Sequence, residues 1–300
     1  MATIYFSGGI PTGPRSCSIV LQPVDADAPD EQYDSHVLEW AVDRAPRVRA
    51  LDFQACSGAC LQNEVFILGR LGEVARVQPD TITREDIDGP ETHGNLVSLR
   101  RIGNRLFACG IARQVYERDA SGNWLRADQG LLDETSPVGT VTGLRDLDGA
   151  APEDIYAVGL EGEIWNRSAS RWRALASPTN VILEQVRAVD SETLYAVGQH
   201  GLILRGRSES WAVIEQGETE ADFWGLELFN RALYLCTASQ LFRLNAAGEL
   251  EALKLPGAPA THLSRLRAGF DTLWLFGATR FFWTTDGSTW HEGVVAPPAG

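Results

Sequence analysis

The chain has 300 residues, with 26 Lys and Arg against 40 Asp and Glu, which gives a formal net charge of −14. This acidity disfavours broad binding to DNA, RNA or anionic lipid, whose phosphates would be repelled. No apolar run approaches the length needed to span a bilayer, and residues 1–14 lack the basic start and apolar stretch of a signal peptide. We therefore expect a cytoplasmic protein that is a monomer on its own and has no nucleic-acid or membrane partner.

The chain divides into units of several short strands. The first unit, 1–45, has apolar segments at 4–7, 17–22 and 36–42 and lacks or borrows an innermost strand. The second unit, 46–90, has apolar segments at 48–53 and 65–69 and a predicted outer strand at 81–87. The remaining units are predicted at 95–128, 139–176, 180–215, 221–254 and 260–296.

The fourth and fifth units show the pattern most clearly. IYAVGLEGEIWNRSASRW (155–172) and TLYAVGQHGLILRGRSESW (193–211) match almost position for position. Each contains a short β-forming run, a turn with glycine at both ends, a second strand, a polar hairpin and a tryptophan. A further apolar segment precedes each copy, so each unit has four strands. These predicted innermost segments are 48–53, 96–102, 141–147, 184–189, 224–229 and 263–268.

The position that ends the β-forming run recurs with a regular period. It is occupied by Gly8, Gly69, Gly110, Gly159, Gly198, Thr237 and Gly277, and the last three steps are 39, 39 and 40 residues. A period near 40 with four short strands per unit is typical of a β-propeller. We predict an all-β chain that forms a single propeller domain of seven four-stranded blades. Six blades with an N-terminal appendage is the alternative.

Two motifs resemble known propeller repeats. TTDGSTW (284–290) resembles a BNR-type Asp-box hairpin, and Asp119 retains the acid in the third unit. The LYAVG…W unit resembles the repeats of photosystem-II-assembly-factor-like bacterial propellers, over roughly residues 46–292. The resemblance implies a propeller in which the Asp-box ties a turn and carries no catalysis, so it supports the fold more than the function.

Charged residues on the predicted innermost strands would form a ring around the central channel. Arg100, Arg145, Arg187 and Arg267 each follow an apolar residue there, and Asp52 and Glu227 take corresponding positions. Such a ring can bind an anion or a partner's acidic side chain through forked hydrogen bonds. The alternative is that the arginines pair with the acids and with backbone carbonyls to close the propeller.

The crossings between blades carry many acids and should lie on one face of the ring. The predicted partner-binding residues are Glu85, Asp86, Asp88, Asp128, Asp133, Glu134, Glu218, Glu220 and Asp222, with Trp224 at the edge. An acidic face with an aromatic anchor suits a basic protein partner, through electrostatic steering followed by burial of the aromatic ring. A solvated rim is the alternative.

No motif indicates catalysis, a metal or a cofactor. The histidines are scattered, the tyrosines Tyr156, Tyr195 and Tyr234 repeat at packing positions, and nucleophile-elbow, phosphate-loop and dinucleotide signatures are missing. Cys56 and Cys60 of CSGAC are placed in a loop, and plain thiols are favoured there over a disulfide or metal site. We expect no catalytic residue, no metal and no cofactor.

The sequence therefore predicts a non-enzymatic, protein-binding propeller in the cytoplasm. One version is an immunity-type inhibitor that neutralises a basic toxin or effector, and another is an assembly factor. The alternative is a carbohydrate-binding or sialidase-like, glycan-cleaving propeller that uses the arginine ring.

Overall fold

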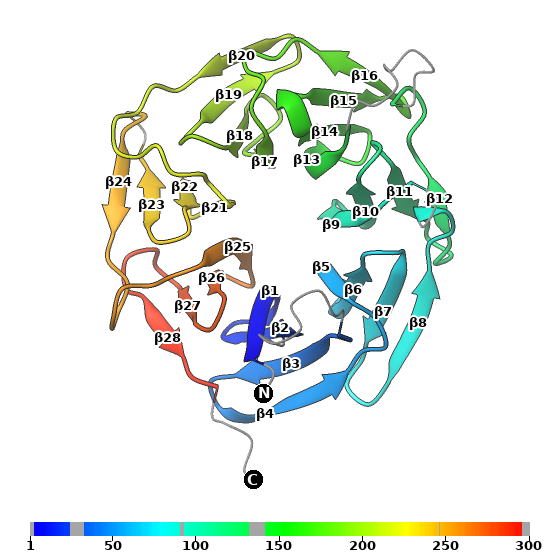
Figure 1. The fold of residues 1–300 in the computed structure, drawn as a ribbon, viewed down its shortest axis with the longest axis vertical. Helices are drawn as coiled ribbons and strands as arrows, with labels where there is room; N and C mark the ends of the chain where they lie inside the picture. Colours follow the sequence, from blue (N-terminus) through cyan, green and yellow to red (C-terminus); the bar gives the residue numbers. More distant parts are fainter. Residues whose placement is uncertain (1–2, 25–32, 91–92, 132–141, 246, 296–300) are drawn as a thin grey trace.

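The computed structural model describes residues 3–24, 33–90, 93–131, 142–245 and 247–295. These residues form seven four-stranded antiparallel sheets around a central opening (Figure 1). Within every sheet the four strands follow chain order from the innermost to the outermost. The predicted all-β, seven-bladed propeller is confirmed, and the alternative of six blades with an appendage is wrong.

The first four blades contain β1 to β16. Their bounds are Thr3–Gly13, Ser16–Val24, His36–Ala41 and Arg44–Ala50 (β1–β4); Ala55–Leu61, Glu64–Gly69, Glu73–Val77 and Ile82–Asp86 (β5–β8); Leu96–Ile102, Arg105–Gly110, Val115–Arg118 and Trp124–Arg126 (β9–β12); and Leu144–Ala151, Asp154–Gly159, Ile164–Ser168 and Arg171–Leu175 (β13–β16). A short 3-10 turn, η2 (Leu160–Gly162), lies between β14 and β15.

The last three blades contain β17 to β28. Their bounds are Leu183–Ala188, Leu194–Gly198, Ile203–Arg207 and Ser210–Val213 (β17–β20); Gly225–Phe229, Ala232–Cys236, Leu241–Leu244 and Leu250–Leu253 (β21–β24); and Leu263–Gly269, Thr272–Gly277, Phe281–Thr284 and His291–Gly293 (β25–β28).

The second glycine of the repeated turn is required by the crossing that passes over it. Gly162 and Gly201 have φ values of +70° and +67°, a region that favours glycine. A Cβ at Gly162 would lie 2.4 Å from the carbonyl oxygen of Thr179, and one at Gly201 would lie 2.2 Å from that of Thr219. The repeat therefore holds each crossing tightly against the turn between the two middle strands.

The hydrophobic core lies between neighbouring blades. Tyr156, Val158 and Ile164 of the fourth blade pack against Val186 and Trp211 of the fifth. The tryptophan of the repeat also forms a hydrogen bond to the neighbouring blade, since Trp172 Nε1 donates to the carbonyl of Ala127 at 2.7 Å. Each blade buries the face of the next, so stability depends on the whole ring.

The ring closes by side-chain packing between the first and last blades. Trp40 packs edge-on against Phe281, with ring centroids 5.0 Å apart. Trp40 Nε1 donates to the carbonyl of Val294 at 3.0 Å, and the amide of Phe6 donates to the carbonyl of Ala278 at 2.7 Å. Among the described residues, each sheet consists of four consecutive strands, so the two blades share none.

The first blade differs from the sequence prediction. Residues 4–7 belong to its innermost strand, β1, and residues 44–50 form its outer strand, β4. The predicted innermost segment 48–53 and the boundary between 45 and 46 are therefore wrong. The innermost strand of the second blade is β5, which contains CSGAC, so Cys56 and Cys60 lie on a strand and not in a loop.

Candidate functional site

The centre of the channel wall contains a buried carboxylate that the sequence analysis missed. Asp146 of β13 is 1% exposed and accepts two hydrogen bonds of 2.8 Å from Nε and Nη2 of Arg100. It also accepts from Ser98 Oγ at 2.8 Å and from Arg187 Nη1 at 3.1 Å. These partners come from β9 and β17, so one side chain joins three blades.

The charge state of Asp146 follows from its neighbours. Burial alone would raise the pKa of Asp146, but the guanidinium groups of Arg100 and Arg187 outweigh it and hold that pKa well below its usual range. Burial alone would lower the pKa of Arg187, whereas Glu227 and Asp146 raise it. Glu227 Oε1 accepts from Arg187 Nε at 3.3 Å. Asp146 and Arg187 therefore stay charged together.

The pairing of the first and second strands of each blade defines a ring of residues around the channel. The ring lies at the end of the innermost strands that leads into the turn to the second strand, such as the turn between β5 and β6. Opposite the same position of the second strand lie Ala59, Arg100, Asp148, Arg187, Glu227 and Arg267. Four predicted ring members, Arg100, Arg187, Glu227 and Arg267, thus stand at equivalent positions, and Asp148 completes the set in the fourth blade.

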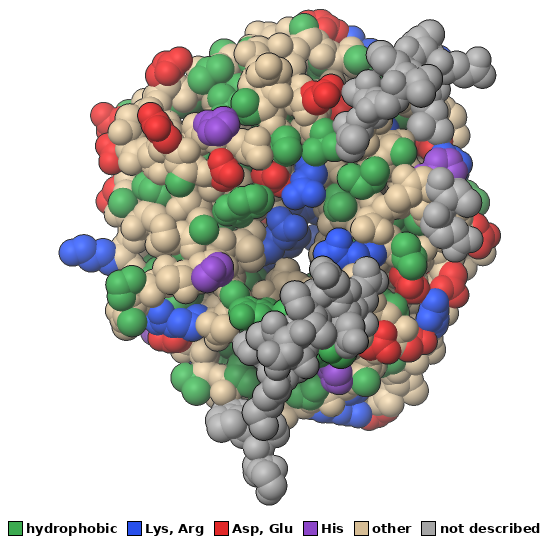
Figure 2. Space-filling model, in the orientation of Figure 1, with side chains coloured by type: hydrophobic (Ala, Val, Ile, Leu, Met, Phe, Trp, Pro, Cys, Tyr) green, Lys and Arg blue, Asp and Glu red, His purple; other side chains and the backbone are tan. Residues whose placement is uncertain are grey.

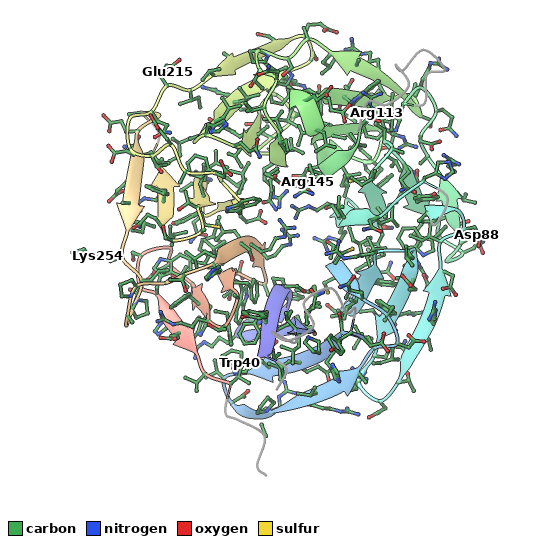
Figure 3. All side chains as sticks on the ribbon, viewed as in Figure 1. Trp40, Asp88, Arg113, Arg145, Glu215 and Lys254 are labelled. Atoms are coloured by element: carbon green, nitrogen blue, oxygen red, sulfur yellow. The ribbon has the colours of Figure 1, made fainter. Side chains whose placement is uncertain are left out.

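Two predicted ring members lie elsewhere. Arg145 sits three residues before Asp148, where a bulge between Leu144 and Asp146 shifts the register. It lies at the edge of the central opening and donates to Glu184 through Nη2 at 2.7 Å (Figure 3). Asp52 lies between β4 and β5, is exposed, and pairs with Arg84 at 2.9 Å. Asp52 is therefore not a channel residue.

Two channel arginines have no carboxylate partner among the described residues. Arg267 Nη1 donates to the carbonyl of Leu266 at 3.1 Å, and Arg265 Nη1 reaches the carbonyl of Trp224 at 3.5 Å. Burial lowers the pKa of Arg267, and the charges of Arg100 and Arg187 lower it further. Burial likewise lowers the pKa of Arg265. Figure 2 shows Lys and Arg side chains inside the central opening.

The predicted acidic face separates into paired and unpaired acids. Glu85 is half-buried and pairs with Arg118 at 2.6 Å, and Asp128 is buried against Arg126. Asp86 is exposed but pairs with Arg84 at 2.8 Å. These three carboxylates already carry a partner charge, so they contribute little free negative charge to a surface.

The remaining described acids lie on two separate crossings. Asp88 is exposed and lies near the rim of the ring (Figure 3). Glu218 and Glu220 are exposed on the crossing from β20 to β21 and make no salt bridge among the described residues. Asp222 and Trp224 are half-buried at the end of that crossing. Asp133 and Glu134 lie outside the described residues.

The crossing from β20 to β21 is braced internally. Gln216 Nε2 donates to the carbonyls of Gly201 and Thr219 at 3.0 and 2.6 Å. Its Oε1 accepts from the amides of Glu218 and Thr219 at 2.9 and 3.1 Å. Asp222 Oδ1 accepts from the amide of His200 at 2.9 Å. The two unpaired acids therefore stand on an ordered loop.

The Thr284–Trp290 hairpin is held by its aspartate. Asp286 Oδ1 accepts from the amides of Ser288 and Thr289, both at 2.7 Å. These amides lower the pKa of Asp286 below its usual range. In the third blade Asp119 Oδ1 accepts from the amides of Ser121 and Asn123 at 2.8 Å.

The surroundings of Tyr156, Tyr234 and the cysteines indicate a role in packing rather than in catalysis. Tyr156 and Tyr234 are buried, and their hydroxyls bond to the amide of Ser208 and the carbonyl of Gly287, both at 3.2 Å. All five cysteines are free thiols, and burial raises the pKa of Cys56 to about 12.

In the described part of the chain, no group of three or more His, Cys, Asp and Glu is arranged to hold a metal. No helix there is long and apolar enough to cross a membrane.

A comparison with curated proteins shows the family. The chain is 33% identical over 233 residues to the immune protein Tsi7 of Pseudomonas aeruginosa, a match that covers 76% of this chain and 74% of that protein. The chain belongs to the Tsi7 family. No family model matches it.

Solved structures share the fold of this Tsi7-family chain at low identity. YCF48 bound to D1 peptide is 15% identical, has a TM-score of 0.63, and matches 92% of this chain and 90% of that one. YCF48 from Cyanidioschyzon merolae is 12% identical, has a TM-score of 0.66, and matches 93% of each chain. Virginiamycin B lyase from Staphylococcus aureus is 15% identical, has a TM-score of 0.66, and matches 81% and 85%. The resemblance to photosystem-II-assembly-factor propellers is thus confirmed for the fold.

Proposed function

We propose that this chain is a cytoplasmic immunity protein that neutralises a basic toxin by binding it, without catalysis of its own. The observation that carries the proposal is the match to the immune protein Tsi7 over three quarters of the chain. Immunity by binding requires a protein partner and an exposed surface for it. The surroundings of the tyrosines and the match to an immune protein favour this function over a sialidase-like one.

The crossing from β20 to β21 is the surface that best suits a basic partner. Glu218 and Glu220 present negative charge that no described cation neutralises. The bracing by Gln216 means that little conformational entropy is lost when a partner binds. We define the partner patch as Glu218, Glu220, Asp222 and Trp224.

Trp224 supplies the patch with an aromatic anchor. It directly precedes β21 and is half-buried, so part of its ring remains available for contact. Tryptophan is enriched among residues that contribute most to binding energy, and surrounding charges mainly set association rate and specificity. Trp224 would therefore slow dissociation, whereas Glu218 and Glu220 would speed association.

The test begins with capture and ends with protection. The tagged chain is used to capture partners from its own organism at low and high salt, and the captured protein is then expressed in a host with and without this chain. We expect the captured protein to stop growth alone and to be tolerated when this chain is present. Growth arrest that this chain does not relieve would refute the immunity role.

A charge-reversal pair tests the patch. Glu218→Lys with Glu220→Lys should slow association about tenfold or more and reduce protection, because it reverses the steering charge. Asp43→Lys with Glu192→Lys is the matched control, since both residues are exposed on turns at the opposite face and the change in net charge is the same. Equal effects of the two double variants would refute the assignment of this face.

A further inference from the structure

A cavity occupies the end of the channel that faces away from the blade crossings. Its volume is 380 Å³, and the turns β5–β6 and β25–β26 contribute Asn63 and Phe270 to its rim. Arg100, Arg101, Arg187 and Arg267 line it together with Asp148 and Glu227. This volume lies within the range of about 300–1,000 Å³ that is typical of small-molecule sites.

The donors in the cavity wall exceed the acceptors that the protein supplies. Nη2 of Arg187 is a buried nitrogen with no hydrogen-bond partner among the described residues, although Arg187 itself is only 4% exposed. Arg267 gives one hydrogen bond to a carbonyl and has no carboxylate partner in that part of the chain. Buried donors are ordinarily satisfied, so Nη2 of Arg187 indicates a missing acceptor, and the half-buried Arg267 beside it has donors left for a ligand.

The local charges also favour an added anion. Asp146 and Glu227 pair with Arg100 and Arg187. The remaining carboxylate of the wall, Asp148, makes no salt bridge with Arg267 among the described residues, and burial raises its pKa, which favours its neutral form. The charge of Arg267 is therefore opposed by those of Arg100 and Arg187. Burial and those like charges lower the pKa of Arg267. An anion beside Arg267 would relieve this repulsion and would accept from the free guanidinium nitrogens.

We propose that this cavity binds a small oxyanion, either free phosphate or the phosphoryl group of a small metabolite, with Arg267 as its main donor and Arg187 behind it. Guanidinium forks match the geometry of phosphate oxygens. A nucleic-acid chain does not fit, because the site is a confined cavity that also carries Asp148 and Glu227. Those carboxylates can accept from hydroxyl groups of a phosphorylated metabolite, whereas Ile10 and Leu99 give the cavity an apolar wall.

Thermal unfolding with added anion tests this site independently of any toxin. The purified chain is titrated with inorganic phosphate and with glucose 6-phosphate at constant ionic strength, with sodium chloride as the blank. We expect a saturable rise of several degrees in Tm, because a ligand that binds only the folded state stabilises it. Tighter binding of the ester by tenfold or more would assign the site to a metabolite, and equal or weaker binding would assign it to free phosphate.

Two variants separate a site from general charge effects. Arg267→Gln should abolish the saturable rise, and without ligand its Tm should equal or exceed that of the parent, because a repelled charge is removed. Arg44→Gln is the control, since its side chain is 80% exposed at the start of β4 and the charge change is the same; it should keep the rise.

The outcomes distinguish this proposal from the immunity role. A rise that is absent, unsaturable or unchanged in Arg267→Gln would overturn the anion site, and so would a marked fall in the Tm of ligand-free Arg267→Gln. The partner patch variant Glu218→Lys with Glu220→Lys should bind phosphate normally. If that variant loses toxin protection but still binds phosphate, the result supports the partner patch and the anion site stands.

Discussion

Asp146→Asn should destabilise the ring more than any exposed substitution of the same kind. The carboxylate receives two hydrogen bonds from Arg100 and one from Arg187, and the side chains of both arginines are less than a tenth exposed. An asparagine keeps the shape but removes the negative charge between them. Arg100 would then be buried without a carboxylate partner among the described residues, and Arg187 would retain only Glu227.

The expected loss is about 3–5 kcal/mol in the free energy of unfolding, which is typical when one partner of a buried ion pair is removed. Each arginine at about 4 Å contributes roughly 4 kcal/mol of attraction at an effective dielectric constant of about 20, and the cost of desolvating Asp146 offsets part of the sum. A loss of this size is a large fraction of the total stability of about 5–15 kcal/mol that is usual for a protein.

Urea unfolding, followed by tryptophan fluorescence and by circular dichroism, measures the effect. Asp43→Asn is the control, since its side chain is 85% exposed, and Ser98→Ala should cost about 1 kcal/mol because it removes one hydrogen bond to Asp146. The pKa of Asp146 is lower in the fold than in the unfolded chain, so its contribution is present above about pH 4 and is lost as the pH falls further. A loss below about 1 kcal/mol at pH 7 would refute the argument.

Two further changes test the seam and the last hairpin. The seam is the contact between the first and last blades, where Gly9 of β1 faces Phe276 of β26. Gly9→Ala should cost about 1–3 kcal/mol or more in unfolding free energy, because its Cβ would lie 2.2 Å from the ring of Phe276. Gly217→Ala, with no atom within 4 Å, is the control, and equal Tm values for the two variants would contradict this account of the seam. Asp286→Ala should lower Tm at pH 7, and the difference should shrink as the pH falls through the depressed pKa of Asp286, since only the charged carboxylate holds the amides of Ser288 and Thr289. A Tm difference that does not change between neutral and acid pH would contradict the second prediction.

The regular blades could be predicted because their pattern is local. Tyr156, Gly159 and Gly162 recur as Tyr195, Gly198 and Gly201, and each repeated glycine is required by a close backbone approach. The first blade has no such pattern, since β1 and β2 are 11 and 9 residues long and carry no matching turn. The sequence therefore predicts residues 48–53 as the start of the next blade and Asp52 as a channel residue, and the structure contradicts both predictions.

The channel could be predicted only in part, because side-chain direction depends on register. Arg145 lies in the bulge between Leu144 and Asp146, where the third blade has Val97, so Leu147, and not Leu144, is the equivalent of Leu99. Asp146 lies opposite Val158, as Ser98 lies opposite Cys109 and Gln185 opposite Val197, so these three positions are equivalent in register. The hairpins differ in length, so counting residues along the sequence does not reveal this equivalence. The pairing of Glu85 with Arg118, 33 residues away in sequence, could not be read from acid content alone.

The two ends of the channel differ in charge balance, and this difference separates the two proposals. Near the crossings Arg145 is paired with Glu184, whereas Arg265 has only the carbonyl of Trp224 as a partner among the described residues. Toward the opposite face Asp146 is shared by Arg100 and Arg187, and Arg267 has no described carboxylate partner. Glu218 and Glu220 thus carry unpaired negative charge on an exposed crossing, and Arg267 carries positive charge inside a cavity. A basic partner would be attracted to the first, and a small anion that enters the second would stabilise the ring on which the crossing is held.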